Sequence, residues 1–307
     1  MLHAVPSPPA EVPQAPAQIM TGLYLQCLRE AYRIGLEEAA LTVRVSPAAV
    51  SRWERAHSPI RPDALTTLLR HYGVADDELD FMVRSLPPLD DNHSRYETQG
   101  SCRSTAHDRW ADVAGDEAAA RLISLMRSAT TVVQYCMVVP VRLRTRDYQQ
   151  ALLDPAVCIS PDEPAPGLPA WVHHVPWASD QRWTVLLDET VLTRGRRARP
   201  ATLASQLRHL ANLTAQETPT GPGATIRILP LSEVLFIQSV GPAAEVTLHG
   251  HRMVVRNSLF PCYETGSRTA RVISAGLREA ADAAWSRDAT HGALMSAAED
   301  MERKSIS

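Results

Sequence analysis

The sequence has little that points to a secreted, membrane-spanning or disulfide-stapled protein. Its 307 residues contain five cysteines, which are odd in number and scattered, with no two at metal-ligand spacing. A disulfide framework is not expected in such a chain, and a reduced cytoplasmic compartment fits best. No apolar run reaches the roughly 18 residues of a membrane span. The first twenty residues lack the basic start and apolar run of a signal peptide. We therefore expect a cytoplasmic protein without membrane contact.

An excess of positive charge is also missing. The chain has 31 Lys and Arg residues against 34 Asp and Glu residues, a formal net charge of -3. Nonspecific attraction to the phosphates of nucleic acid is therefore weak unless basic side chains gather locally. Lys304 is the only lysine, which codon usage in a GC-rich genome explains without functional selection for arginine.

Recognisable catalytic motifs are absent as well. There is no Gly-rich phosphate loop, nucleophile elbow or paired cysteine motif. The neighbouring side chains of His173-His174 diverge on an extended backbone. His249 and His251 flank a predicted turn, where solvated residues are the simpler interpretation. Asp188-Glu189 ends a predicted strand and suits a turn or helix start better than acid–base chemistry. We therefore predict no catalytic residue, no metal and no cofactor.

What is present divides the chain into four parts. Residues 1–20 are rich in Pro and Ala and are interpreted as a disordered arm. Residues 21–86 show the spacing of five short helices. Residues 87–107 combine Pro, Asp, Ser and Gly and are interpreted as a linker. Residues 108–300 mix strand and helix patterns. The predicted fold class is α+β, with an all-α five-helix helix-turn-helix domain followed by a larger mixed α+β domain.

The most informative stretch is Leu36–Arg55, which predicts two short helices joined by a tight corner. Ser46 stands where an N-cap belongs, and Pro47 follows at the first helical position, where a missing N–H is tolerated. Such a pair forms a helix-turn-helix, whose second helix can enter the major groove of DNA. The inward faces are predicted to be Leu36, Ala39, Ala40 and Val43 on the first helix, and Val45, Val50 and Trp53 on the second.

The second domain is predicted from alternating and helical apolar patterns. Turn residues at His249-Gly250 predict a hairpin. The expected strands are 130–139, 183–188, 225–229, 235–240, 245–248 and 252–256, and the expected helices are 118–127, 147–153, 201–214 and 269–285.

These residues resemble a known family. Residues 25–74 resemble the DNA-binding domain of the phage-repressor-like (XRE-type) helix-turn-helix regulators, most specifically over Val45–Arg55. Residues 139–148, 183–189 and 225–230 are similar to the domain of unknown function that follows this module in actinobacterial regulators of the WhiJ-like group. The resemblance implies a sequence-specific transcriptional regulator whose partner is double-stranded DNA.

The resemblance also assigns roles within the second helix. Positions matching Ala48, Ser51 and Arg52 face base edges in relatives, and Arg52 would take a guanine in a bidentate contact. Arg44 and Arg55 are better placed for phosphate. Glu54 matches an acidic residue that pairs with an arginine on the first helix, here Arg29. The predicted DNA-binding set is Arg44, Ser46, Pro47, Ala48, Ser51, Arg52 and Arg55.

The chain departs from the family pattern at several places. Leu36 stands where many relatives have a phosphate-binding Gln. Arg44 stands where the corner residue is usually Gly, and a positive φ there would cost roughly 1 kcal/mol relative to Gly. In the second domain Val141 and Arg144 replace a Gly and a Gln. These departures motivate a second hypothesis, in which the scaffold is a recruited small-molecule-binding protein or enzyme.

Aromatic residues of the second domain suggest a ligand site. Aromatic side chains on a Pro-rich loop beside a strand suit a lid over an apolar ligand, although closure of the core of an irregular segment is the favoured explanation. Arg142, Arg144 and Arg146 occupy every second position of one segment. They are interpreted as a solvated face, and the alternative is a contact with an anion or a partner. The candidate pocket residues are Tyr135, Tyr148, Trp171, Trp177 and Trp183.

Two partners follow from these expectations. A homodimer would place two second helices in successive major grooves about one DNA turn apart. The second domain would sense a small molecule or, as the WhiJ-like resemblance implies, a small acidic protein in an antitoxin-like pairing.

Overall fold

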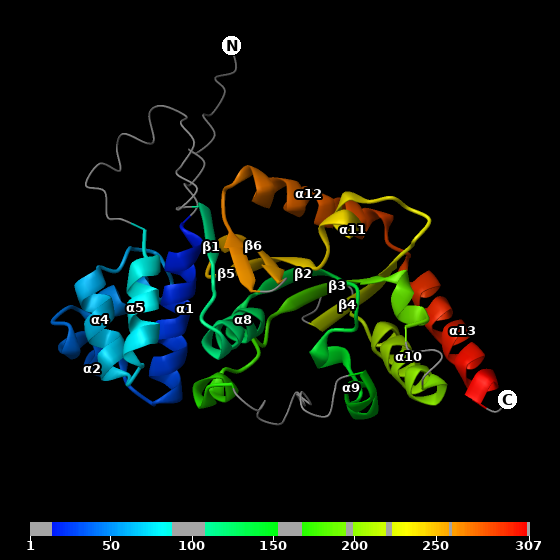
Figure 1. Ribbon diagram of the computed structural model, residues 1–307, viewed down its shortest axis with the longest axis horizontal. Helices are drawn as coiled ribbons and strands as arrows, with labels where there is room; N and C mark the ends of the chain where they lie inside the picture. Colours follow the sequence, from blue (N-terminus) through cyan, green and yellow to red (C-terminus); the bar gives the residue numbers. More distant parts are fainter. Residues whose placement is uncertain are drawn as a thin grey trace, which may run out of the picture.

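The computed structural model describes residues 14–87, 108–152, 168–194, 199–218, 223–257 and 260–305. A helical N-terminal unit lies beside a larger unit built on one sheet (Figure 1). This arrangement confirms the predicted fold class, a helix-turn-helix region followed by a mixed α+β domain. None of the helices in these ranges has the length and apolar character needed to cross a membrane.

The N-terminal unit consists of five helices that enclose a small apolar core. Ala39, Val50, Leu65 and Leu68 lie in this core, each with no more than 1% of its surface exposed. The predicted helical spacing is therefore confirmed for the second, third and fourth helices. The five helices are α1 (Pro16–Ala31), α2 (Leu36–Thr42), α3 (Pro47–Glu54), α4 (Pro62–His71) and α5 (Asp76–Ser85).

Helix α1 corrects the expected boundary of the disordered arm. It begins at Pro16, so residues 16–20 are helical, and Ile19 and Met20 are buried. Proline suits the first helical turn because that N–H has no partner within the helix. Gly22 allows α1 to approach the end of α3, since a Cβ there would lie 2.5 Å from the carbonyl oxygen of Trp53. The Pro/Ala-rich segment therefore continues into the first turn of a packed helix.

The larger unit is built on a seven-stranded mixed sheet in the order β1-β7-β6-β5-β2-β3-β4. Strands β2, β3 and β4 are parallel, and the remaining neighbours are antiparallel. The predicted hairpin around His249-Gly250 is confirmed, with positive φ at both turn residues. The strands are β1 (Arg109–Ala111), β2 (Thr131–Cys136), β3 (Arg182–Asp188), β4 (Gly223–Leu229), β5 (Ala243–Leu248), β6 (His251–Asn257) and β7 (Pro261–Glu264).

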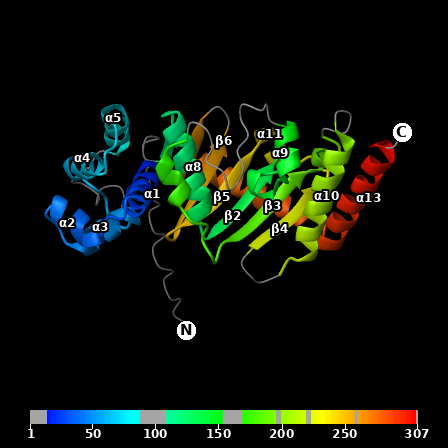
Figure 2. The ribbon, with the colours of Figure 1, turned by 90° about the horizontal axis from the view of Figure 1, so that it is seen from below.

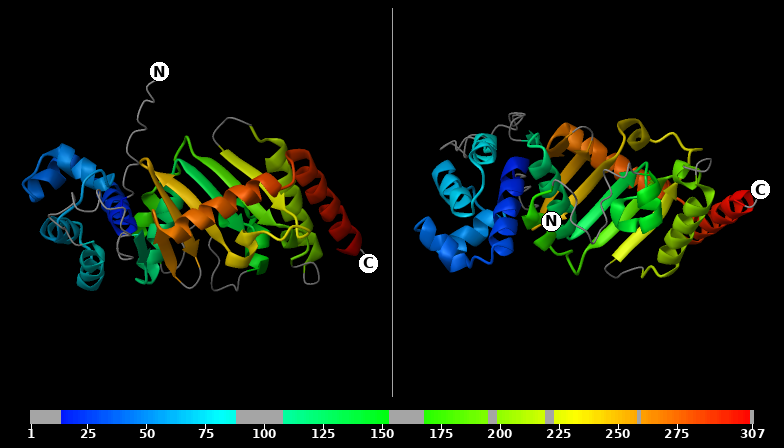
Figure 3. Two further views of the ribbon diagram at one scale, coloured as in Figure 1. Left: turned by 90° about the horizontal axis from the view of Figure 1, so that it is seen from above. Right: turned by 60° about the horizontal axis from the view of Figure 1, so that its bottom comes forward.

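Helices cover both faces of the sheet. Figure 2 looks onto the face covered by α8, α9 and α10, and the left view of Figure 3 looks onto the opposite face, which α12 crosses. Helix α13 packs along α10. The helices are α8 (Asp116–Ser128), α9 (Arg146–Leu152), α10 (Pro200–Ala215), α11 (Phe236–Val240), α12 (Arg268–Ala283) and α13 (Arg287–Ser305), with 3-10 turns η1 (Val141–Leu143), η3 (Ala170–His174) and η4 (Glu189–Leu192).

Several elements differ from the sequence expectation. Residues 235–240, expected as a strand, form the short helix α11 against α12. Short apolar runs do not distinguish a strand from a buried helical turn. Helix α13 and strands β1 and β7 were not predicted. The expected linker lies almost entirely outside the described residues.

Candidate nucleic-acid interface and apolar cavity

Helix α3 has the cap that its sequence predicts. The Ser46 Oγ accepts a hydrogen bond from the Ala49 amide at 3.3 Å, and Pro47 occupies the first turn. Val50 faces the core and is 1% exposed. Ser46, Pro47, Ala48 and Arg52 are exposed, and Ser51 is half-buried. The predicted base-facing side of α3 is therefore open to solvent.

The corner before α3 adopts the strained conformation expected of a glycine position. Arg44 has φ of +55°, and its amide donates to the carbonyl of Leu41 at 3.2 Å. A side chain in this left-handed region costs roughly 1 kcal/mol relative to Gly. Leu36, at the start of α2, is half-buried and packs against the core. Leu36 is thus a packing residue, whereas Arg44 keeps an exposed cation at an energetic cost.

Three exposed arginines surround α3. Among the described residues, Arg44, Arg52 and Arg55 have no carboxylate partner and their side chains are free to meet phosphate or bases. Arg29 is instead fixed by Glu54, with Nε–Oε1 and Nη2–Oε2 distances of 2.6 and 3.0 Å. This bidentate pair confirms the structural role expected for Glu54, which is itself buried. The positive patch on α3 is therefore local.

The β5–β6 hairpin contacts the chain just after α3. A ring nitrogen of His251 lies 2.9 Å from the carbonyl oxygen of Arg55, and a ring nitrogen of His57 lies 3.4 Å from that of His249. Burial, followed by the charge of Arg55, lowers the pKa of His249. His249 and His251 flank the hairpin turn as predicted, but both are half-buried at the contact between the two units and are not simply solvated.

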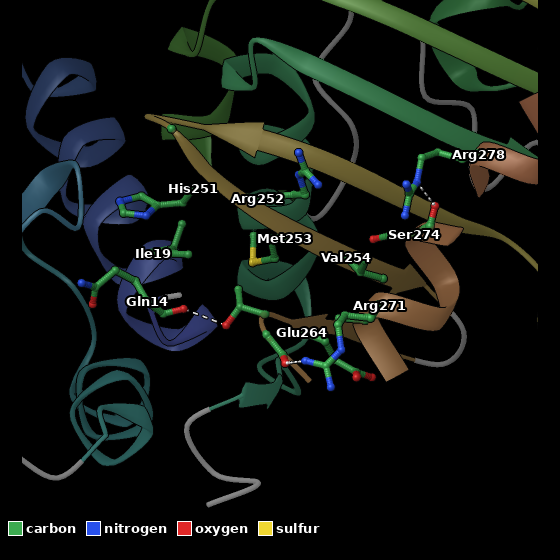
Figure 4. A pocket seen from close by; sticks show the side chains of 14 residues that line it. Gln14, Ile19, His251, Arg252, Met253, Val254, Glu264, Arg271, Ser274 and Arg278 are labelled. Atoms are coloured by element: carbon green, nitrogen blue, oxygen red, sulfur yellow. Dashed lines mark hydrogen bonds between the residues drawn. The ribbon is translucent and has the colours of Figure 1, made fainter. Parts of the chain in front are cut away.

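A basic cleft adjoins this contact. It encloses about 510 Å³ between the start of α1, the hairpin and α12 (Figure 4). The exposed side chains of Arg252, Arg271 and Arg278 line it. Arg271 donates to the carbonyl of Gly266 at 2.6 Å, and Arg278 to that of Ser274 at 3.3 Å. Both guanidiniums retain further donors that face the cleft.

A second, apolar cavity lies on the α8 face of the sheet. Its volume is about 370 Å³, within the range of small-molecule sites. Trp177 and Trp183 line it, as does the backbone around Tyr135. The side chain of Tyr135 points to the other face of the sheet, where its hydroxyl donates to Asp188 at 2.7 Å. Two of the five predicted aromatic side chains therefore reach this cavity.

The other two aromatic candidates have structural positions. Trp171 is buried at the joint between the units, its ring 5.3 Å from that of Tyr24, and its indole donates to Glu117 at 3.2 Å. Tyr148 is buried on α9 and does not line the cavity. These two side chains therefore close the core, as the alternative interpretation of the aromatic residues expected.

The acidic pair at the end of β3 has the turn role expected of it. Asp188 caps η4 by accepting from the Thr190 amide at 3.0 Å, and Glu189 accepts from the Leu231 amide at 2.7 Å. Burial raises the pKa of Asp188, but the hydrogen bonds from Thr190 and Tyr135 outweigh it and leave this pKa below its ordinary value. Within the described ranges, no three His, Cys, Asp or Glu residues cluster as metal ligands do.

Residues 119–296, more than half of the chain, match a domain of unknown function (DUF5753). The chain belongs to the DUF5753 family. Residues 22–82 match a helix-turn-helix domain, which indicates a DNA-binding regulator. No curated protein and no solved structure matches the chain significantly.

The DUF5753 unit is joined to the helix-turn-helix unit through an ion cluster that the sequence did not reveal. Arg121 on α8 is fully buried and pairs with both oxygens of Asp112 at 2.7 and 2.8 Å. It also donates to Glu78 on α5, and its guanidinium lies 5.0 Å from the ring centre of Tyr24 on α1. One cation thus contacts both units.

The electrostatics of this cluster are unbalanced. Arg121 faces Asp112, Glu78 and the nearby Glu117, so carboxylates outnumber the cation. Burial, only partly offset by Arg121, raises the pKa of Glu78 from 4.5 to about 7. Burial also raises the pKa of Glu117, against the hydrogen bonds that it accepts from Tyr24 and Trp171. Uptake of a proton by Glu78 or Glu117 would reduce this excess of negative charge at the joint.

Proposed function

We propose that this DUF5753 protein is a cytoplasmic transcriptional regulator that recognises a specific duplex DNA sequence with α3. One observation carries the proposal: Pro47, Ala48 and Arg52 on the outward side of a capped α3 are exposed alongside the described part of the C-terminal half. This exposure favours DNA recognition over the alternative of a recruited small-molecule-binding protein or enzyme, which would not need that surface free.

Five residues in and beside α3 have a proposed role in DNA binding. Arg52 donates in a bidentate manner to guanine O6 and N7, and the methyl group of Ala48 contacts thymine. Ser51 lies between them and reads either base edge. Arg44 and Arg55, at the two ends of the helix, neutralise phosphates and set its position along the groove.

The test begins with selection of bound sequences from random duplex DNA at moderate salt. Mobility shifts then compare Arg52→Ala with Arg84→Ala, which removes an exposed arginine on α5, away from α3 (Figure 2). A bidentate base contact is worth about 1–3 kcal/mol, so Arg52→Ala should lose roughly 5- to 150-fold discrimination at one base pair. Unchanged sequence preference in Arg52→Ala would refute the base-reading role.

The proposed regulator acts as a homodimer. Two copies of α3 would meet half-sites about 34–36 Å apart on one side of the duplex. Selected sequences should therefore be inverted repeats, and sedimentation of the protein–DNA complex should give two chains per duplex. A single asymmetric site bound by one chain would contradict this arrangement.

The C-terminal half is proposed to sense an effector. The apolar cavity beneath α8 is the proposed site for a small molecule. The cleft of Figure 4, lined by exposed arginines, is the proposed site for a small acidic protein partner. Reversing that charge with Arg271→Glu and Arg278→Glu should abolish binding of an acidic partner without changing duplex binding. Unchanged partner binding would exclude the cleft.

A further inference from the structure

The cavity beneath α8 combines an apolar wall with a polar floor. Side chains of Leu122, Met126, Val172 and Val255 contribute to its wall. Gln134, in the centre of β2, faces it from the sheet. Gln134 is 7% exposed and belongs to the cavity lining. A side-chain amide offers both a donor and an acceptor, so a polar group of a ligand in the cavity can pair with it.

Two arginines at the same cavity pair only with neutral acceptors among the described residues, unlike several other arginines of this protein. Arg127 donates to the carbonyls of Val172 and Val175 at 3.0 and 3.2 Å, and Arg142 donates to the amide oxygen of Gln181 at 3.0 Å. All of these acceptors are neutral. Arg29, Arg121 and Arg227, by contrast, each pair with a carboxylate.

Arg142 is exposed, and two indole rings lie close to its guanidinium. Its guanidinium lies 4.0 Å from the ring centre of Trp177 and 5.3 Å from that of Trp183. Burial lowers the pKa of both Arg142 and Arg127. Both guanidiniums keep donors beyond those used by their neutral acceptors, and a planar guanidinium matches a carboxylate in geometry.

We propose that this cavity binds an organic carboxylate with an apolar body. The body contacts the wall formed by α8 and Val172, a polar group on it pairs with the amide of Gln134, and the carboxylate meets Arg142 and Arg127 at the mouth. This inference names the ligand class of the sensor function proposed above and rests on it.

The position of the cavity explains how such a ligand would affect DNA binding. Helix α8 carries Leu122 and Met126 at the cavity and Arg121 at the joint with the helix-turn-helix unit. The η3 turn likewise carries Val172 at the cavity and Trp171 against Tyr24 of α1. Movement of either element on ligand binding would act directly on α1.

Matched probes test the ligand class. Calorimetry of the full chain compares acids with their primary amides in three pairs: naphthaleneacetic, phenylbutyric and dodecanoic. At least one acid should bind about tenfold more tightly than its amide, a ratio that corresponds to roughly 1.4 kcal/mol. Equal binding of acid and amide in every pair, or no binding in any pair, would overturn the proposal.

Variants identify the arginine responsible for the tighter binding of the acid than of its amide. Arg142→Gln should reduce the ratio to about one, and Arg142→Lys should restore most of it. Arg182→Gln, which removes an exposed arginine from the first residue of β3, should leave the ratio unchanged. A preference that persists in Arg142→Gln and in an Arg127→Gln, Arg142→Gln double variant would overturn the assignment.

Failure of this inference can be told apart from failure of the proposed function. Calorimetry measures ligand binding without DNA, whereas mobility shifts on the selected duplex measure regulation. If an acid binds through Arg142 but never alters duplex affinity, the ligand class stands and the sensor function fails. If duplex binding is specific but no acid is preferred, the regulator stands and the ligand class fails.

Discussion

Replacing Arg121 with methionine tests whether one buried cation joins the two units. Methionine keeps an unbranched side chain of similar length and removes the charge. Asp112 is fully buried and Glu78 is 8% exposed, so both carboxylates would be left without their cation in a site that water barely reaches. The change leaves the surface of α3 untouched.

The expected loss of stability is large. Removing one partner of a buried ion pair costs about 3–5 kcal/mol, because the remaining charge is uncompensated. In domains of 150–250 residues each kcal/mol lowers Tm by about 2–4 °C, which gives a fall of roughly 6–20 °C at pH 7.5. The fall should be smaller at pH 5, since burial raises the pKa of Glu78 and this stranded carboxylate can take up a proton there.

Scanning calorimetry of the full chain at pH 5 and pH 7.5 measures both effects. Arg70→Met, on the exposed side of α4, is the matched control and should change Tm little. A variant Arg121→Met with the Tm of the wild type would show that the cluster does not hold the units together. An equal loss at both pH values would refute the role given to the stranded carboxylates.

Two other predictions concern single positions. Arg44→Gly should stabilise the protein by up to about 1 kcal/mol in urea unfolding yet weaken duplex binding in mobility shifts; a variant that loses both would mean that the positive φ is not strained. The pKa of Glu78 is raised to about 7 in the folded protein, so the folded state binds this proton more tightly than the unfolded chain does. The stabilisation from the bound proton is full below pH 4.5 and is lost as pH rises through 7. Glu78→Gln, which stays neutral, should therefore gain stability over the wild type between pH 5 and 8, on the order of 2–3 kcal/mol, and a pH-independent difference in urea midpoints would contradict this.

The helix-turn-helix was predictable because local signals agree there. The cap at Ser46, the proline at the first turn and the spacing of Val50 all act within one or two turns of helix. The pairing of Arg29 with Glu54 was also expected, although from the resemblance and not from spacing. Strands β2, β3 and β4 were found because buried parallel strands are continuous apolar runs.

The joint and the cavity could not be predicted, because distant residues form them. Nothing local distinguishes Arg121 from a solvated arginine on an amphipathic helix, and its partner Glu78 lies 43 positions away. Residues 16–20 resembled a disordered arm because their burial depends on the second unit. From the sequence, Gln134 is an ordinary strand residue, and only the assembled sheet shows that it lines the cavity.

The contact between the β5–β6 hairpin and the end of α3 has a consequence for operator architecture. The hairpin turn meets the backbone at Arg55 and the ring of His57, so the chain that follows α3 is held against the sheet-bearing unit. In the proposed regulator α3 is the recognition helix. Two chains associated through their sheet-bearing halves would hold their recognition helices at one fixed separation. The number of base pairs between half-sites would then be a property of the DUF5753 unit, and grafting the first 87 residues onto another dimer would change it.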